Sequence, residues 1–187
     1  MKRIIKNPNS EIVTEGLSYP KDKVKIRELL EKEQQYICAY WEDRITGSSS
    51  IDVEHFNPLL KETPQDGYEN WFAVCHRANL LKGTINADSR WQEYQPLINP
   101  TDKDLEEKIC YDKESGDYFG IGTEAQNLVD YLNLNDHELR EDRIDYEVVI
   151  NDYIDENGIE WTINFLKRNR SQVRFRRVLE VVFNIQL

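Results

Sequence analysis

The chain has 187 residues, of which 39% are hydrophobic and 32% are charged, and its formal net charge at pH 7 is −11. This length and apolar content predict one good core, with one domain and an appended helical part. No stretch approaches the roughly eighteen apolar residues of a membrane span, the first residues lack the apolar run of a signal peptide, and the three cysteines favour reduced thiols, so we expect a cytoplasmic protein.

The negative charge opposes binding of a polyanion, so contacts with nucleic-acid phosphates would require a local concentration of cations. Acidic residues gather at 101–117 and 136–160. Basic residues form a short run followed by further arginines: Lys167–Arg170, Arg174, Arg176 and Arg177. This basic cluster is either a phosphate-binding surface or a set of solvated or ion-paired side chains facing the acidic helix.

The first expected elements are a helix and a hairpin. Apolar residues recur at helical spacing from Ile26 onward, which predicts a helix at 21–36. The hairpin is expected to pair strands near 37–43 and 50–55 through a turn of small polar residues at 46–49.

A second hairpin and several helices are expected in the second half of the chain. After an irregular segment that ends near residue 100, strands at 109–111 and 117–119 flank a turn-forming run. Four helices should follow, at 123–132, 136–155, 159–168 and 171–182.

The central segment carries the residues with chemical potential. Glu54 and His55 are expected at the end of a hairpin strand, Asn70 follows fifteen residues later in a loop, and Asn79 lies nine residues further on, in a short helix at 75–83. In-line hydrolysis of a nucleic-acid phosphate requires a general base and a divalent cation that neutralises developing charge. The pattern therefore predicts a site that cleaves phosphodiester bonds.

Each of these residues has an expected role. His55 suits the general base, because an unperturbed pKa of about 6.5 leaves much of the imidazole neutral at cellular pH. Glu54 and Asn79 offer hard oxygen ligands, which favour Mg²⁺ or Mn²⁺. Successive strand residues point to opposite faces, so Glu54 and His55 meet at one site only where the strand ends, and Asn57-Pro58 supplies that break. Asn70 follows a turn-forming run and is expected to orient the base.

Several segments resemble a known family. Residues 34–42, 53–58 and 68–83 resemble the HNH proteins of the Septu anti-phage system and of retron operons, and residues 96–100 and 125–135 resemble the downstream blocks of that family. The resemblance covers most of the chain, and its specific part is the finger that carries Glu54-His55, Asn70 and Asn79.

The resemblance implies a fold and a function. The expected fold class is α+β, with a ββα-metal (HNH) finger and an N-terminal helix at 1–100, and with a small hairpin and a helical part at 101–187 packed on it. It implies a metal-dependent endonuclease that hydrolyses DNA with one Mg²⁺ or Mn²⁺ ion, as the nuclease subunit of an anti-phage complex with a separate ATPase. Arg77 and Lys82 would then contact nucleic acid, or would merely be solvated.

One departure from the family concerns structural zinc. The family finger usually carries two Cys-x-x-Cys pairs, but here Cys38 is followed by Trp41 and Cys75 by Ala78 at the partner positions. Two thiols do not complete a tetrahedral site, and His76 diverges from its neighbour Cys75 by about 100 degrees on a helix, so structural zinc is not expected. Trp41 is expected to fill the vacated volume by apolar packing.

Two other functions remain compatible with the residues. The first is a non-catalytic, degenerate finger whose acidic helices dock onto a partner ATPase and regulate it. The second is a ribonuclease that uses the same finger, because the motif does not distinguish DNA from RNA.

Overall fold

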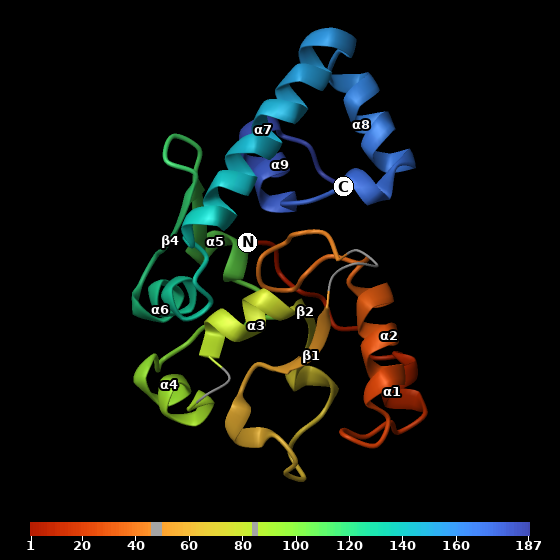
Figure 1. Cartoon of the computed structure of the whole chain (residues 1–187), viewed down its shortest axis with the longest axis vertical. Helices are drawn as coiled ribbons and strands as arrows, with labels where there is room; N and C mark the ends of the chain where they lie inside the picture. The colour runs from red at the N-terminus through yellow and green to blue at the C-terminus, as the bar shows by residue number, and fades with distance from the viewer. Residues whose placement is uncertain (46–49, 84–85) are drawn as a thin grey trace.

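The N-terminal half contains helices followed by a strand–strand–helix unit (Figure 1). The computed structural model describes residues 1–45, 50–83 and 86–187, so the turn expected at 46–49 lies outside the described residues. The elements in chain order are α1 (Glu11–Thr14), α2 (Lys23–Glu33), β1 (Ile51–His55), β2 (Trp71–Cys75) and α3 (His76–Gly83). Helix α2 confirms the helix expected at 21–36.

Strands β1 and β2 pair in antiparallel register, from Ile51 opposite Cys75 to His55 opposite Trp71. Helix α3 begins directly after β2 and packs against both strands. We call β1, β2 and α3 the ββα unit. The loop between its strands carries two short 3-10 turns, η1 (Pro58–Leu60) and η2 (Tyr68–Asn70).

The strand partner predicted for residues 50–55 is wrong. Residues 37–43 contribute no strand, and the described part of the segment makes only an isolated bridge between Ile37 and Arg44. Tyr36 and Glu42 adopt positive φ angles of 59° and 57°, a left-handed conformation that interrupts extended backbone on both sides. The partner is the continuous apolar run of β2, which is buried on both faces.

The middle of the chain contains more helix than expected. Helix α4 (Ala87–Glu93) lies in the segment predicted to be irregular, and α5 (Leu105–Lys108) precedes the second hairpin. That hairpin is confirmed, because β3 (Ile109–Asp112) pairs antiparallel with β4 (Asp117–Gly120).

The C-terminal part is helical, as predicted. It consists of α6 (Thr123–Tyr131), α7 (His137–Asn157), α8 (Ile159–Arg168), the 3-10 turn η3 (Arg170–Gln172) and α9 (Arg176–Phe183). The fourth predicted helix begins later than expected, because Phe175 has a φ of 42° and caps α9. None of the described helices is both long enough and apolar enough to cross a membrane.

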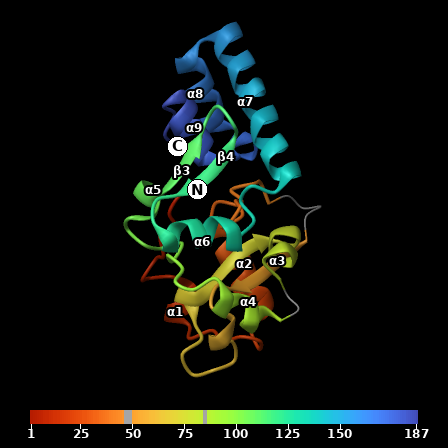
Figure 2. The same cartoon turned by 90° about the vertical axis from the view of Figure 1, so that its left-hand side faces the viewer.

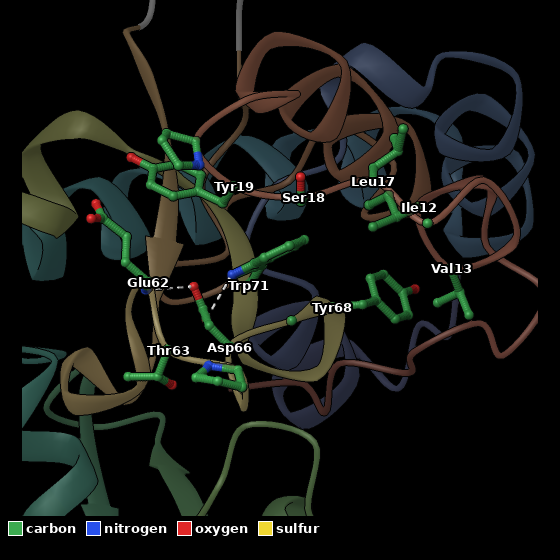
Figure 3. A pocket seen from close by; sticks show the side chains of 14 residues that line it. Ile12, Val13, Leu17, Ser18, Tyr19, Glu62, Thr63, Asp66, Tyr68 and Trp71 are labelled. Atoms are coloured by element: carbon green, nitrogen blue, oxygen red, sulfur yellow. Dashed lines mark hydrogen bonds between the residues drawn. The ribbon is translucent and has the colours of Figure 1, made fainter.

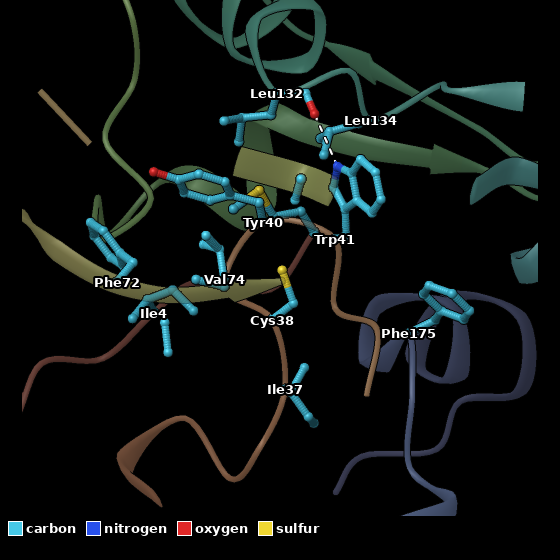
Figure 4. Close-up of a cluster of buried hydrophobic side chains, with 14 of the residues drawn as sticks. Ile4, Ile37, Cys38, Tyr40, Trp41, Phe72, Val74, Leu132, Leu134 and Phe175 are labelled. Atoms are coloured by element: carbon cyan, nitrogen blue, oxygen red, sulfur yellow. Dashed lines mark hydrogen bonds between the residues drawn. The ribbon is translucent and has the colours of Figure 1, made fainter. Parts of the chain in front are cut away.

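The two halves share one hydrophobic core, and the α+β class is confirmed. The α7–α8 pair forms one end of the molecule and the loop between β1 and β2 forms the other (Figures 1 and 2). Between them, Trp41 is 6% exposed, and its indole N–H donates to the carbonyl of Leu132 at 3.0 Å (Figure 4). Trp41 therefore ties the segment before β1 to the end of α6.

Replacement of Trp41 by Ala should destabilise the fold strongly. The change removes a buried indole, which costs about 3–5 kcal/mol, and it leaves the Leu132 carbonyl without its donor. Urea denaturation followed by circular dichroism measures the loss. Trp161→Ala is the matched control, since Trp161 is 39% exposed. An equal loss in both variants would show that Trp41 is not a core residue.

Candidate active site between β1 and α3

A cavity of about 210 Å³ lies between β1 and α3 and gathers three of the predicted site residues. Glu54, His55 and Asn79 all line it. Asp52 and Lys82 line it as well, because residues two apart on a strand and three apart on a helix share a face. Asn70 does not line this cavity. The structure therefore brings together the predicted base and both predicted metal ligands.

His55 is the last residue of β1 and is 6% exposed. The edge of the Tyr19 ring contacts it at a centroid distance of 4.6 Å, and the Trp71 ring lies at 6.3 Å. Burial lowers the pKa of His55 below its usual value, and the nearby Asp66 carboxylate opposes this shift. The imidazole is thus held in its neutral form at neutral pH, which is the form a general base requires.

Asp66 is the carboxylate beside His55, and the sequence reasoning missed it. His55 Nε2 lies 3.0 Å from Asp66 Oδ2, but the oxygen lies off the direction of a ring N–H, so the contact is electrostatic rather than an aligned hydrogen bond. The other oxygen, Oδ1, accepts from Trp71 Nε1 at 2.9 Å (Figure 3) and from Asn70 Nδ2 at 3.0 Å. Asp66 is fixed from two sides and faces the imidazole.

Asn70 closes the loop between the two strands. Its Oδ1 accepts from the Asn57 backbone N–H at 2.8 Å, and its Nδ2 donates to the Asn57 carbonyl at 3.0 Å. Because Asn70 also donates to Asp66, its effect on His55 passes through that carboxylate. Asn70 therefore contacts Asp66 and not His55 directly, and its orienting role stays a prediction.

Glu54 forms a buried ion pair with Lys82. The Lys82 ammonium contacts Glu54 Oε1 and also donates to the carbonyls of His55 at 2.8 Å and Phe56 at 3.2 Å. Burial lowers the pKa of Lys82 to about 7. The direct contact with the Glu54 carboxylate acts in the opposite direction and favours the charged form. Lys82 is 3% exposed, so the expected contact between Lys82 and phosphate is not supported by its position.

Asn79 pairs with Asp52, a second residue that the sequence reasoning did not select. The Asn79 amide donates to Asp52 Oδ2 at 2.8 Å, and His76 Nδ1 lies 2.8 Å from the same oxygen. The alternation of Asp52 with Glu54 along β1 was the available signal, since both then face α3.

Arg77 is exposed but ion-paired. Its guanidinium contacts Asp136 Oδ1 at 3.1 Å and the Glu138 carboxylate, at the N-terminus of α7. Contact with Glu138 raises the pKa of Arg77. A phosphate bound by Arg77 would have to compete with these two carboxylates.

Three arginines of the basic cluster form ion pairs, but only Arg174 pairs with the acidic helix α7, as one interpretation of the sequence predicted. Arg174 Nε lies 2.6 Å from Asp43 Oδ1, and its Nη2 lies 3.5 Å from Asp142 on α7. Two further pairs join Arg176 to Glu42 at 3.6 Å and Arg177 to Glu180 at 2.7 Å. Lys167, Arg168 and Arg170 are exposed.

Cys38 and Cys75 lie close together. Cys38 is buried and accepts from the Cys75 backbone N–H at 3.4 Å, while Cys75 is half-buried. Within the described ranges, no group of three or more His, Cys, Asp or Glu side chains is arranged to hold a metal ion. The absence of structural zinc stays a prediction.

A larger pocket of about 630 Å³ adjoins the environment of His55 (Figure 3). It is lined by Tyr19, Trp71 and Asp66, the three side chains that surround the imidazole, and by the α1–α2 connection. The ring of Tyr19 also lines the smaller cavity, so it contributes to the walls of both.

Comparisons of the chain with protein-family models, with curated protein sequences and with solved structures find no match. The function is therefore inferred from the geometry of the site.

Replacement of Asn70 by Ala should destabilise the fold by about 1–3 kcal/mol, because it leaves partly buried backbone groups of Asn57 without partners. Urea denaturation measures the change in the free energy of unfolding. The control is Asn164→Ala, at an exposed position of α8, for which no loss is expected. A loss for Asn70→Ala no larger than the control's would contradict the loop-closing role.

Proposed function

We propose that this chain is a metal-dependent endonuclease of the HNH type that hydrolyses phosphodiester bonds of DNA. One observation carries the proposal. A buried imidazole with a lowered pKa, that of His55, lies in the wall of a cavity that also holds carboxylate and amide oxygens. A general base beside hard oxygen donors is the combination that phosphodiester hydrolysis requires.

In this proposal His55 takes a proton from the attacking water. Asp66 faces Nε2, and its negative charge stabilises the imidazolium that forms. Hydrogen bonds from Asn70 and Trp71 hold the Asp66 carboxylate in that position. The rings of Tyr19 and Trp71 restrict rotation of the imidazole and limit access of bulk water to it. The base is thus positioned by packing and by one carboxylate.

The donor set of the cavity fits a hard divalent cation. Asn79 Oδ1 and a carboxylate of β1, for which Glu54 is the residue indicated by the sequence, are the oxygen ligands that Mg²⁺ and Mn²⁺ prefer. When bound, the cation would neutralise charge on the phosphate and on the leaving oxygen.

The charge distribution supports a partner that holds the nucleic acid. The net charge is −11, and Arg77, Arg174, Arg176 and Arg177 are all engaged by carboxylates. Exposed cations remain, among them Lys23 and Lys61 in the lining of the cavity, but against this net charge a phosphate backbone would need further ones. A separate ATPase subunit that binds DNA in an anti-phage complex would supply them, as the resemblance noted in the sequence implies.

A non-catalytic regulatory module is the second candidate function. The observation that favours it is the Glu54–Lys82 ion pair, which commits one carboxylate of the cavity to an internal cation. In that case the chain would bind a partner through its acidic helices and would cleave neither DNA nor RNA.

Replacement of His55 by Ala should lower metal-dependent cleavage about 10²–10⁴-fold, the range for loss of a general base. The assay follows relaxation and linearisation of supercoiled plasmid in Mn²⁺ or Mg²⁺, with transfer RNA digested in parallel to separate DNA from RNA cleavage. His137→Ala is the control, because that imidazole is 70% exposed on α7. Undiminished cleavage by the His55 variant would refute the assignment, and complete inactivity of the unmodified chain with its partner would favour the regulatory module.

The rate of cleavage should rise with pH up to a plateau, and the bend of this pH–rate profile should lie below pH 6.5. Only the neutral imidazole accepts a proton, and burial places the pKa of His55 below the usual histidine value of about 6.5. Among the charged neighbours, Asp66 and Glu62 raise this pKa and Lys61 lowers it. Asp66→Asn should therefore move the bend of the pH–rate profile to lower pH. A bend above pH 6.5, or an upward shift in this variant, would contradict the account.

A further inference from the structure

We propose that the divalent cation binds between Asp52 and Asn79, and that Lys82 withholds Glu54 from it. This inference deepens the proposed function and rests on it for the use of the cation, although cation binding can be measured without any substrate. The sequence indicates Glu54 as the carboxylate ligand, and this inference replaces it by Asp52.

The Lys82 ammonium is fully satisfied where it lies. An ammonium has three N–H donors, and Lys82 Nζ has three oxygen acceptors, on Glu54, His55 and Phe56. The Lys82 and Glu54 side chains are 3% and 9% exposed. The position against Glu54 is therefore already occupied by a cation that belongs to the chain.

Displacement of Lys82 by a metal ion is unfavourable. It would leave an ammonium group inside the protein without a counter-ion, and breaking one partner away from a buried ion pair is strongly destabilising. Mg²⁺ also gives up its hydration shell reluctantly and favours sites where it can keep several waters. The enclosed Glu54 carboxylate does not meet that condition.

Asp52 is accessible enough for a hydrated cation. Its side chain is 24% exposed, and it lies on the same face of β1 as Glu54, two residues closer to the start of the strand. On α3, Asn79 faces Asp52 and Lys82 faces Glu54, so the helix and the strand are joined by two parallel side-chain contacts. The two contacts differ in the helix residue. Glu54 faces the Lys82 ammonium, whereas Asp52 faces the neutral Asn79 amide, whose oxygen can serve as a ligand for a cation.

His76 orients the carboxylate of this site. Its Nδ1 lies 2.8 Å from the same Asp52 oxygen that accepts from Asn79, and its side chain is 51% exposed. Both contacts fix the direction of the Asp52 carboxylate from the α3 side. The site is thus formed by one turn of α3 and one residue of β1, and Asp52 and Asn79 line the same cavity as His55.

The test is a titration of the full chain with Mn²⁺, followed by the electron paramagnetic resonance signal of the free ion. Asp52→Asn and Asn79→Ala should each weaken Mn²⁺ binding tenfold or more. Glu54→Gln would leave Lys82 without its counter-ion and lower stability, so the informative variant is Glu54→Gln combined with Lys82→Met, which removes both charges. This double variant should bind Mn²⁺ within threefold of the unmodified chain. Asp155→Asn, at an exposed position of α7, controls for the loss of one negative charge.

The opposite pattern overturns the inference: Mn²⁺ binding that survives Asp52→Asn and is lost in the double variant places the ion at Glu54. Absence of Mn²⁺ binding by the unmodified chain overturns it as well. Plasmid cleavage separates this inference from the proposed function. Mn²⁺ held at Asp52 without any cleavage supports the site and refutes the nuclease, whereas metal-dependent cleavage that tolerates Asp52→Asn supports the nuclease and refutes the site.

Discussion

Antiparallel pairing of β1 with β2 is the constraint on which the rest of the site depends. It sets His55 opposite Trp71 at the end of the ladder, and it delivers the chain directly into α3. Helix α3 then packs across the same strands, so that its inward residues meet the polar face of β1. The Asn70 side chain closes the long connection between the strands by hydrogen bonds to the backbone of Asn57. Asn70 also donates to Asp66, which faces the imidazole.

Burial lowers the pKa of two titratable side chains in the cavity beside this pairing, and their neighbours offset that effect to different degrees. His55 is pushed toward its neutral form, and the carboxylate of Asp66 only partly offsets that effect. Lys82 is equally enclosed but has a carboxylate and two carbonyls as direct acceptors, which support its charge. A neutral base and an internally compensated cation in one small cavity leave Asp52 as the more accessible carboxylate of the strand.

Sequence reasoning identified much of this site, because local patterns report local geometry. The strand that ends at His55 and the second hairpin follow from strand patterns and turn formers, whereas the helix that carries Asn79 was expected from the resemblance to the HNH finger. The strand partner was missed because β2 is a short, fully apolar run that periodicity alone does not distinguish from a core segment, and because the left-handed residues around 37–43 leave no mark in the sequence. Asp66 was missed because its contact with His55 depends on a loop closed by hydrogen bonds between the Asn70 side chain and the Asn57 backbone. The buried position of Lys82 was missed because a lysine near a helix end is ordinarily exposed.

The distribution of charge is the reason for proposing a partner. Acidic residues of α7 and of the segment before β1 engage Arg77 and Arg174, so these two arginines contribute to the cohesion of the chain more than to an electropositive surface. A nucleic acid would then be held chiefly by another molecule and cut where it meets the cavity between β1 and α3.

The most direct test of this account is a crystal structure of the chain soaked with Mn²⁺, in which anomalous scattering locates the ion without reference to any activity. The account predicts a peak in the cavity that His55 lines, between the side chains of Asp52 and Asn79, with Lys82 still against Glu54. An ion bound elsewhere with that cavity empty, or an imidazole of His55 that lies outside it, would contradict the account.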